Sequence, residues 1–289
     1  MEVKLLDCTL RDGAYVVNSL FGADRIKGII NSLSLSGIEI IECGWLKDCS
    51  FNKDSVFFSE PEDLKNFCLN KKSKLALMFD CGKYNISNLP INSGAVDIIR
   101  VAFNKRNLDE VSFLSEKVKK QGYQLFLQPS NILDYTDCEI EKLCKRANYI
   151  GAESLYIVDS FGSMFPEDLD RIMPFFKEIP NKNIEIGFHS HNSIELSFAL
   201  SMQFINNMNR NIIVDSTLCG IGRGAGNTKT ELITEFLYRN NKRYRIDVIW
   251  ECLEKNILPL CKQYNWEYTP KRAYKGIHGL HPTQDVNTL

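Results

Sequence analysis

The sequence has no excess of charge of either sign. It contains 35 Lys and Arg residues against 36 Asp and Glu residues, which gives a net charge of -1. A chain with this balance has no basic field that would attract nucleic acid or anionic lipid. We therefore expect no nucleic-acid partner.

Long apolar segments are also missing, since no run approaches the roughly 20 residues that a transmembrane helix needs. The first seven residues carry an acid at position 2 and lack the basic and apolar regions of a signal peptide. Ten cysteines are present, but no two of them have the C-x-x-C spacing of zinc knuckles and thioredoxin-like sites. These features predict a cytoplasmic protein with reduced thiols and no membrane association.

What the sequence does contain is a series of eight short apolar segments rich in β-branched residues. Near-continuous apolar runs are typical of parallel strands that are covered on both faces. Segments of helical period lie between them, which predicts a repeated β/α unit, and eight such units close a (β/α)8 TIM barrel. The predicted strands are 3–10, 38–45, 74–80, 96–103, 124–130, 154–160, 184–190 and 211–217.

The weakest unit is the third, because residues 81–95 contain two glycines and a proline and predict a loop with at most a short helix. Two more helices are predicted after the eighth strand, near residues 228–240 and 246–264. Too few residues follow that strand to form a second core. We therefore predict a TIM-barrel catalytic domain over residues 1–240 and a short C-terminal helical extension over residues 241–289 that closes the barrel.

Apolar residues on the predicted helix near 246–264 allow two interpretations. They fit packing into the core, and they also fit the face of a homodimer. The residues concerned are Trp250, Leu253, Ile257 and Leu260.

The active site of such a barrel lies at the carboxyl ends of its strands, where this sequence places several polar residues. His189 and His191 stand two positions apart on a predicted strand, so both face the same side. Imidazole is a frequent ligand of divalent metals, and Asp12 would add a carboxylate from the first strand. This donor set suits Mn2+, Mg2+, Zn2+ or Co2+ and leaves positions open for a bidentate substrate. The alternative is two hydrogen-bonded histidines that hold no metal.

Arg11 and Glu42 are the charged residues expected beside this site. The planar guanidinium of Arg11 suits a carboxylate or a developing enolate oxygen. The alternative is a salt bridge with Asp7, Glu42 or Asp215 across the barrel mouth, and both can hold. Glu42 lies in an apolar strand, where a carboxylate is costly to bury without a partner such as Arg11 or a metal.

A glycine-rich segment over residues 220–228 also has two interpretations. Its spacing fits the G-x-G-x-x-A form of a dinucleotide-binding turn, with Asp247 as the ribose ligand. Too few residues follow it for the strands that such a domain would need. We therefore favour a loop after the eighth strand that brings Asn227 to the metal and offers backbone N–H groups to an anion.

Four motifs in this order resemble those of the DRE-TIM metallolyase superfamily, the hydroxymethylglutaryl-CoA lyase-like TIM barrels. Members of this superfamily include 4-hydroxy-2-oxovalerate aldolase and the isopropylmalate and homocitrate synthases. The resemblance extends almost from end to end and is closest to the 4-hydroxy-2-oxovalerate aldolase branch. The motifs are DCTLRDG at 7–13, VDSFGSM at 158–164, GFHSHN at 187–192 and GRGAGNT at 222–228.

The resemblance implies a divalent metal, with Mn2+ or Mg2+ expected first and Zn2+ or Co2+ next. Its implied ligands are Asp12, His189 and His191, with Asn227 joining them as in the lyase and synthase branches. The implied reaction forms or cleaves a carbon–carbon bond between the enolate of a 2-oxo acid, pyruvate, and an aldehyde.

The resemblance further implies that Arg11 steadies the enolate and that Ser160 contacts the carboxylate of the 2-oxo acid. The aldolase branch has a histidine as general base where this sequence has Tyr15. A phenol with an ordinary pKa near 10 donates a proton readily but accepts one only when strongly perturbed. Arg11, Tyr15 and Glu42 are thus the catalytic candidates, while His278 and His281 are other candidates for the base.

Two departures from the superfamily concern partners. The aldolase branch has a longer C-terminal region that docks an aldehyde dehydrogenase, so we expect no such partner here. The domains that acyl-CoA-dependent synthases carry beyond the barrel are also missing. Two alternatives stay open, namely an acyl-CoA-dependent synthase that condenses with a 2-oxo acid, and a non-catalytic barrel that binds metal or oxo acid, an idea motivated by Tyr15.

Overall fold

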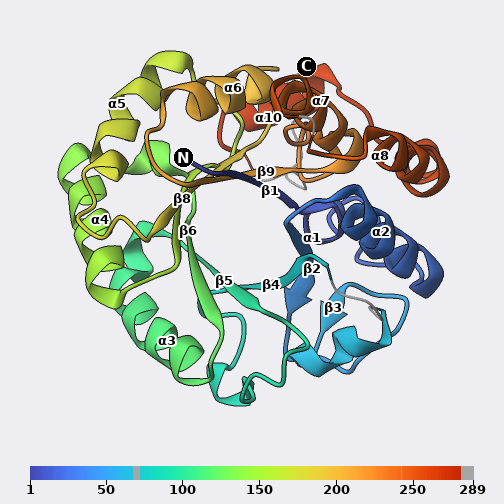
Figure 1. Cartoon of the computed structure of the whole chain (residues 1–289), viewed down its shortest axis with the longest axis horizontal. Helices are drawn as coiled ribbons and strands as arrows, with labels where there is room; N and C mark the ends of the chain where they lie inside the picture. Colours follow the sequence, from blue (N-terminus) through green and yellow to red (C-terminus); the bar gives the residue numbers. More distant parts are fainter. Residues whose placement is uncertain (68–71, 242, 281–289) are drawn as a thin grey trace.

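The computed structural model describes residues 1–67, 72–241 and 243–280. Eight parallel strands form a closed barrel with helices around its outside (Figure 1). Closure is direct, because Leu6 on the first strand pairs with Asp215 on the last strand and with Ile40 on the second. The barrel strands are β1 (Val3–Asp7), β2 (Ile40–Leu46), β4 (Lys74–Asp80), β5 (Ile98–Phe103), β6 (Gln124–Pro129), β7 (Ser154–Asp159), β8 (Glu185–Ser190) and β9 (Ile212–Ser216).

The predicted TIM barrel is therefore confirmed, and each of the eight predicted strands overlaps one observed strand. A further short strand, β3 (Phe57–Phe58), pairs with the carboxyl end of β2. Six helices follow the barrel strands along the chain. They are α2 (Ala23–Ser36), α3 (Leu108–Lys120), α4 (Asp137–Ile150), α5 (Pro166–Lys177), α6 (Ser197–Asn207) and α7 (Thr230–Asn241).

Helix α4 shows how the sequence defines these elements. Thr136 and Glu139 form a reciprocal capping box at its beginning, and Gly151 ends it with a positive φ of 66°. Its buried side chains follow the predicted helical stripe and pack against the barrel. They are Ile140, Leu143, Cys144 and Ala147.

The barrel interior is built in layers because alternate residues of each strand point inward. An apolar layer includes Ile40, Ile98 and Ile213, all at most 2% exposed. Two residues further along the same strands lie Glu42, Arg100 and Asp215, which are also buried. The alternation therefore places a charged layer on top of an apolar floor, towards the carboxyl ends of the strands.

The first predicted strand, 3–10, is too long. Strand β1 ends at Asp7, and a short helix, α1 (Thr9–Gly13), follows it. The Asp7 carboxylate accepts the N–H of Thr9 at 2.9 Å, which turns the chain at this point. Asp12 is consequently carried by a helical turn above the barrel mouth.

The loops on one side of the barrel contain 3-10 turns in place of full helices. Such a turn, Ile86–Asn88, lies between β4 and β5, in the segment predicted as a loop with at most a short helix. Another, Pro61–Asn66, follows β3. The helical layer is therefore thinnest around β2 and β4.

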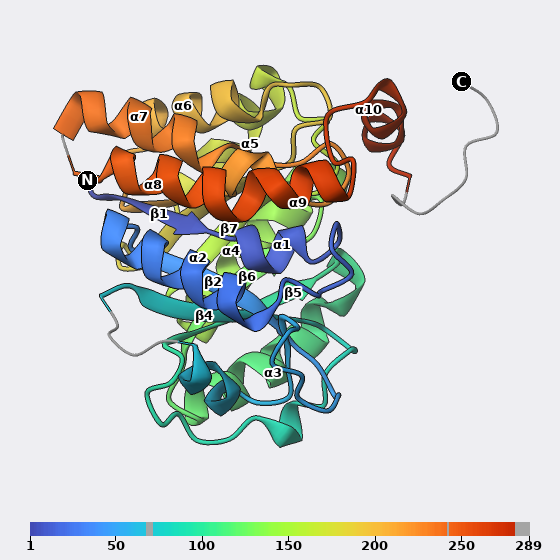
Figure 2. The ribbon, with the colours of Figure 1, turned by 90° about the vertical axis from the view of Figure 1, so that its right-hand side faces the viewer.

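After α7 the chain forms a long rod made of α8 (Ile246–Cys252), a π-helical turn (Leu253–Ile257) and α9 (Leu258–Gln263). The rod packs against α2 and α7 on the outside of the barrel (Figure 2). Leu253, Ile257 and Leu260 are core residues, whereas Trp250 is 46% exposed. Core packing thus accounts for three of the four residues that also fitted a homodimer face.

The last described helix, α10 (Pro270–Ile277), lies apart from the rod, beyond the carboxyl ends of the strands (Figure 2). A side chain at Gly276 would overlap Ser193, so this helix sits directly against the loop that follows β8. None of the helices in the described ranges is long and apolar enough to cross a membrane.

Candidate metal centre

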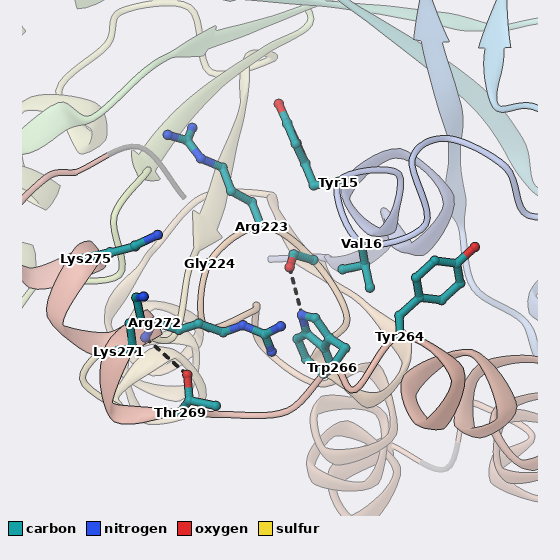
Figure 3. A pocket seen from close by; sticks show the side chains of 11 residues that line it. Tyr15, Val16, Arg223, Gly224, Tyr264, Trp266, Thr269, Lys271, Arg272 and Lys275 are labelled. Atoms are coloured by element: carbon teal, nitrogen blue, oxygen red, sulfur yellow. Dashed lines mark hydrogen bonds between the residues drawn. The ribbon is translucent and has the colours of Figure 1, made fainter. Parts of the chain in front are cut away.

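A small pocket of about 80 Å3 opens at the carboxyl ends of the barrel strands. Tyr15 and Arg223 stand at its edge and also line a second, larger pocket outside it (Figure 3). Six of the eight residues predicted for the site line the small pocket. They are Arg11, Asp12, Tyr15, Ser160, His189 and His191.

The three predicted charged or imidazole ligands converge on one point. Asp12 Oδ2 lies 3.7 Å from Nε2 of His189 and 3.9 Å from Nε2 of His191. The two imidazole rings stand nearly perpendicular, with centroids 5.1 Å apart. All three side chains are buried, so the group is shielded from bulk water.

Hydrogen bonds on the far side of each ring orient the imidazoles. Nδ1 of His189 lies 2.9 Å from Oδ2 of Asp215, and Nδ1 of His191 lies 3.1 Å from the carbonyl oxygen of Gly226. A carbonyl only accepts, so Nδ1 of His191 carries the proton and its Nε2 presents a lone pair to Asp12. Burial lowers the pKa of His191 to about 3, which keeps this ring neutral.

Asp12 is held ionised at the centre of the group. Burial is the largest single effect and would raise its pKa, but the positive charge of Arg11 and the other neighbouring groups, including the backbone N–H of Arg223, together hold the pKa well below its usual range. Its Oδ1 accepts the backbone N–H of Arg223 at 3.2 Å. Its Oδ2 is buried and has no hydrogen-bond partner among the described residues, although Nη1 of Arg11 lies 3.3 Å away.

Asn227 lies beside this group, as the loop interpretation predicted. It forms an isolated bridge with His191, and both polar atoms of its side chain are buried without a hydrogen-bond partner in the described chain. A Cβ added at Gly222 would come within 2.2 Å of Asn227 Nδ2 and 3.1 Å of Asp12 Cγ. The glycine therefore allows the amide and the carboxylate to approach each other.

These unpaired atoms test whether a cation would fit. A buried carboxylate oxygen and a buried amide without partners are costly, and two imidazole lone pairs aimed at the carboxylate add repulsion. A divalent cation would satisfy all four groups at once. The donor set of two nitrogens and two oxygens is therefore suited to a divalent metal.

The glycine-rich segment packs beside the candidate metal ligands, hereafter the metal group (Asp12, His189, His191 and Asn227). The described fold does not support a dinucleotide-binding domain. Strand β9 is the last strand in the described chain, so no further β/α units follow residues 220–228. The backbone of the segment instead binds the ends of β8 and β9. Thr228 N–H donates to Ser190, and Asn192 N–H donates to Gly226.

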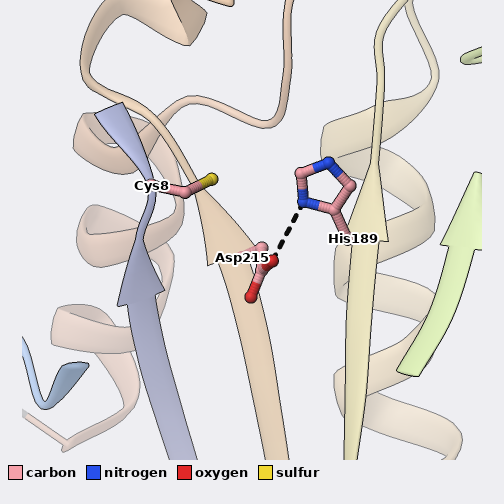
Figure 4. Close-up of side chains that lie close together, drawn as sticks. All are labelled: Cys8, His189 and Asp215. Carbon is pink, nitrogen blue, oxygen red and sulfur yellow. Dashed lines mark hydrogen bonds and ion pairs between the residues drawn. The ribbon is translucent and has the colours of Figure 1, made fainter. Parts of the chain in front are cut away.

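A second group of potential ligands comprises Cys8, His189 and Asp215 (Figure 4). Burial raises the pKa of the Cys8 thiol far above its usual value, so it stays protonated and a poor ligand. Asp215 Oδ2 is already engaged by His189 and by Nη2 of Arg100 at 2.5 Å. This group therefore supports His189 from behind and does not form a separate site.

A chain of buried ion pairs joins the metal group to the barrel floor. Glu42 Oε2 lies 2.7 Å from Nε of Arg11 and 2.8 Å from Nη1 of Arg100, and Arg100 continues to Asp215. Of the three salt-bridge partners considered for Arg11, the structure selects Glu42. Asp7 instead accepts a hydrogen bond from Thr230, and Asp215 pairs with Arg100.

The formal charges of this layer do not cancel. Among the ion-paired residues, Asp12, Glu42 and Asp215 carry three formal negative charges against the two positive charges of Arg11 and Arg100. One uncompensated negative charge in a buried site is unfavourable. The imbalance is a further reason why this mouth suits a cation.

Arg100 was not among the predicted site residues, and it is fully buried with its guanidinium 4.7 Å from the ring centre of Tyr156. A signal was available, because an arginine within the apolar run 96–103 needs a buried partner, as Glu42 does in its strand. The opposite charges of two such residues on different strands would have suggested the pair.

Tyr15 lies at the pocket edge, with its ring edge-on to Trp45 at 6.1 Å. Burial of the phenol group and, to a smaller degree, the negative charge of Asp12 raise the pKa of Tyr15 to about 12. At neutral pH this phenol is a proton donor. The indole N–H of Trp45 donates to the carbonyl oxygen of Arg11 at 3.0 Å and so ties this edge to α1.

Ser160 faces the pocket from the end of β7, where its Oγ accepts the N–H of Asn131 at 2.8 Å. The neighbouring Asp159 organises the following turn, because its carboxylate accepts the backbone N–H groups of Gly162, Ser163 and Met164. No role was predicted for Asp159, although an acid that ends an apolar strand before a glycine is typical of such a turn.

Of the two tail histidines, only His278 lies within the described residues, and it does not line the small pocket. The ring of His278 packs against Tyr274 at an interplanar angle of 46°, with ring centroids 4.1 Å apart. His281 lies outside the described residues.

The comparison with protein families agrees with the barrel and its polar mouth. Residues 2–251 match the model of the HMGL-like family. The chain belongs to this family. The resemblance to the hydroxymethylglutaryl-CoA lyase-like superfamily is therefore confirmed, and the protein is a lyase-type enzyme.

Curated relatives in this family carry two different activity names. An oxaloacetate decarboxylase of Mycobacterium tuberculosis is 24% identical over 98% of this chain and 84% of its own length. A 4-hydroxy-2-oxovalerate aldolase of Geobacillus genomosp. 3 is 27% identical over 89% of this chain and 77% of its own. The HMG-CoA lyase of Bacillus subtilis superposes with a TM-score of 0.75 at 14% identity, covering 94% of this chain and 97% of that one, which shows the shared fold.

Proposed function

We propose that the protein is a divalent-metal-dependent aldolase that joins or separates pyruvate and an aldehyde, like 4-hydroxy-2-oxovalerate aldolase. The observation that carries this proposal is the buried Oδ2 of Asp12, which forms no hydrogen bond within the described chain and faces two imidazole nitrogens, with Nη1 of Arg11 3.3 Å away. Asp12, His189, His191 and Asn227 would hold the metal. Mn2+ or Mg2+ is our first choice, with Zn2+ or Co2+ next.

When bound, a divalent cation would polarise the carbonyl of the 2-oxo acid and stabilise negative charge on its oxygen. Arg11 would orient the same substrate, since its guanidinium lines the pocket and its remaining N–H groups suit a carboxylate or enolate oxygen. The hydroxyl of Ser160, at the end of β7, lines the same pocket and would bind the carboxylate of the 2-oxo acid.

Glu42 has a different role from the one expected of a catalytic residue. Its ion pairs are with Arg11, which lines the pocket, and with Arg100, which does not, and Glu42 itself is not among the pocket-lining residues. We therefore treat it as a positioning residue for Arg11. Tyr15, in contrast, faces the pocket and would give its phenolic proton to the alkoxide that forms when an aldehyde accepts the enolate.

The activity test is pyruvate release from 4-hydroxy-2-oxo acids by protein freed of metal and then supplied with Mn2+, Mg2+, Zn2+ or Co2+. We expect turnover only with added metal and its loss in Asp12→Asn. The exposed variant Asp134→Asn serves as the control. No turnover across a panel of 4-hydroxy-2-oxo acids at saturating metal would overturn the aldolase proposal and favour the non-catalytic barrel.

Decarboxylation of a 2-oxo acid is a second candidate because of Tyr15. Loss of CO2 from a 3-carboxylated 2-oxo acid leaves the same enolate and needs a proton donor, but no base to deprotonate a hydroxyl group. A phenol with a pKa of about 12 meets that need. A kcat/KM for oxaloacetate decarboxylation at least tenfold higher than that for aldol cleavage would favour the decarboxylase function.

A further inference from the structure

A second pocket of about 410 Å3 lies outside the metal centre, between α10 and the loop after β9 (Figure 3). Figure 3 shows Lys271, Arg272 and Lys275 entering from α10, while Tyr15 and Val16 come from the segment after α1. The complete lining is Tyr15, Val16, Gly222, Arg223, Gly224, Tyr264, Trp266, Thr269, Lys271, Arg272 and Lys275.

The charge of this pocket is of one sign. Four of its lining residues are cationic, and none is acidic. Within the described ranges, Arg223, Lys271 and Arg272 form no salt bridge with a carboxylate. The guanidinium of Arg223 lies over the ring of Phe161, and that of Arg272 lies over Trp266 and donates to the carbonyl oxygen of Glu267. A chain with a net charge of -1 has thus gathered four cations around one opening, which predicts an anionic ligand.

The pocket walls are fixed by contacts to the metal-binding loops. Trp266 Nε1 donates to the carbonyl oxygen of Gly222 at 3.1 Å, and the next residue, Arg223, donates its N–H to Asp12. On the other side, the packing of Gly276 against Ser193 holds α10 in place. The cations are therefore carried by elements anchored on both sides of the metal group.

The two pockets are neighbours, because Tyr15 and Arg223 line both. The inner pocket, at about 80 Å3, has room for little more than a three-carbon oxo acid. A second substrate that reacts at the metal group must therefore extend past Tyr15 and Arg223 into the outer pocket.

We propose that the outer pocket binds a phosphate group carried by the aldehyde half of the substrate, so that the enzyme acts on a phosphorylated aldehyde. This inference rests on the proposed aldolase function. Several cations around one opening match a dianionic phosphate better than a neutral aldehyde. The aromatic faces of Tyr15, Tyr264 and Trp266 would contact the carbon chain between the reacting carbon and the phosphate.

The reaction balances without a further reactant. In condensation, the C3–H bond of pyruvate breaks and its proton passes to water. C3 then forms a bond with the aldehyde carbon as the π bond of the aldehyde breaks, and the aldehyde oxygen takes one proton from Tyr15, which regains a proton from water. Nothing is oxidised or reduced, and the phosphate ester stays intact.

Binding is tested first, with probes that cannot react. Calorimetric titration of the metal-loaded protein would compare glycerol 3-phosphate with glycerol. The double variant Lys271→Gln/Arg272→Gln removes two of the cations. The control is Lys120→Gln, which removes an exposed lysine at the end of α3, away from the pocket. We expect glycerol 3-phosphate alone to bind, with affinity reduced at least tenfold in the double variant and unchanged in the control.

Binding that survives in the double variant, or no preference for the phosphorylated probe, would overturn the proposal. Because these titrations need no turnover, they also separate the two proposals. Phosphate-dependent binding without aldol activity would leave the anion site standing while the aldolase function fails.

Kinetic measurements then test whether the phosphate group that binds belongs to the aldehyde substrate. We expect kcat/KM for condensation of pyruvate with glyceraldehyde 3-phosphate to exceed that with glyceraldehyde by tenfold or more, with the preference lost in the double variant. Equal rates for the two aldehydes would overturn the assignment. Tight competition by coenzyme A, with thiol release from acetyl-CoA in place of aldol turnover, would also overturn it and assign the cations to an acyl-CoA-dependent synthase.

Discussion

Nδ1 of His189 lies 2.9 Å from Oδ2 of Asp215, directly behind the candidate metal centre. The carboxylate fixes the ring orientation and leaves Nε2 to face Asp12. Burial would raise the pKa of Asp215, but the charge of Arg100 and the hydrogen bonds from His189 and Arg100 together lower it, which keeps the carboxylate ionised. The contact therefore couples the metal group to the buried ion pairs below it.

Replacing Asp215 tests this coupling. In Asp215→Asn the amide can present N–H to the ring, which no longer favours the tautomer with a free Nε2. Loss of such a partner weakens metal binding about 10–100-fold, measurable by metal titration with a competing chelator. Cys8→Ala is the control. Equal loss of affinity in the control would show that the metal is bound by the Cys8, His189 and Asp215 group instead.

Gly222→Ala should weaken metal binding through Asn227. The backbone at Gly222 does not require a glycine conformation, but the added Cβ would come within 2.2 Å of Asn227 Nδ2. We expect roughly tenfold lower metal affinity, in line with a disturbed ligand shell. In an Asn227→Ala background the same change should cost little more, since the overlap is gone. Additive losses in the double variant would contradict this explanation.

Tyr15→Phe tests the proton-donor role. A general acid contributes on the order of 10²–10⁴ in rate, so kcat for condensation should fall by at least 100-fold. The KM for pyruvate and the metal affinity should change little, because the phenol is no proposed ligand. The alkaline limb of the pH–rate profile should also move. An unchanged kcat would remove Tyr15 from the mechanism, and restored turnover in Tyr15→His would show that a base can serve at this position.

Asp7 predicts a pH dependence of stability. Burial outweighs its hydrogen bonds and raises its pKa from 3.8 to about 6. Between these two pH values the Asp7 carboxyl loses its proton in the unfolded chain but keeps it in the folded protein. The contribution of Asp7 to the free energy of unfolding is therefore present below about pH 4 and is lost as pH rises through 6. The shift corresponds to about 3 kcal/mol.

Asp7→Asn should remove this dependence. Urea unfolding at several pH values should show the stability of the variant, relative to wild type, rising by about 3 kcal/mol between pH 4 and 7. Asp134→Asn, at an exposed carboxyl, should show no such trend. A constant difference between Asp7→Asn and wild type across this range would contradict a raised pKa.

Much of the fold could be predicted because parallel strands covered on both faces leave a clear apolar signal. The spacing of His189 and His191 placed both on one side of β8 by alternation alone. The position of Asp12 could not be derived in the same way, because a single hydrogen bond from Thr9 to Asp7 turns the chain and replaces the end of the predicted strand with α1.

The rest of the site depends on long-range geometry. The pairing of Arg11 with Glu42, and of Arg100 with Asp215, is decided by which strands meet across the barrel interior. The sequence names candidate partners but carries no signal that chooses among them. The outer pocket was not predicted, because its cations lie in the tail and gain meaning only where α10 sits over the barrel mouth.

The glycine at position 276 lets α10 rest on Ser193 without any intervening side chain. The depth of the outer pocket therefore depends on how closely α10 packs against the loop after β8, and not on the barrel itself. Larger residues at this position in relatives would lift the helix and lengthen the accessible space while leaving all four proposed metal ligands in place. Substrate length and reaction chemistry could in this way diverge separately on the same barrel.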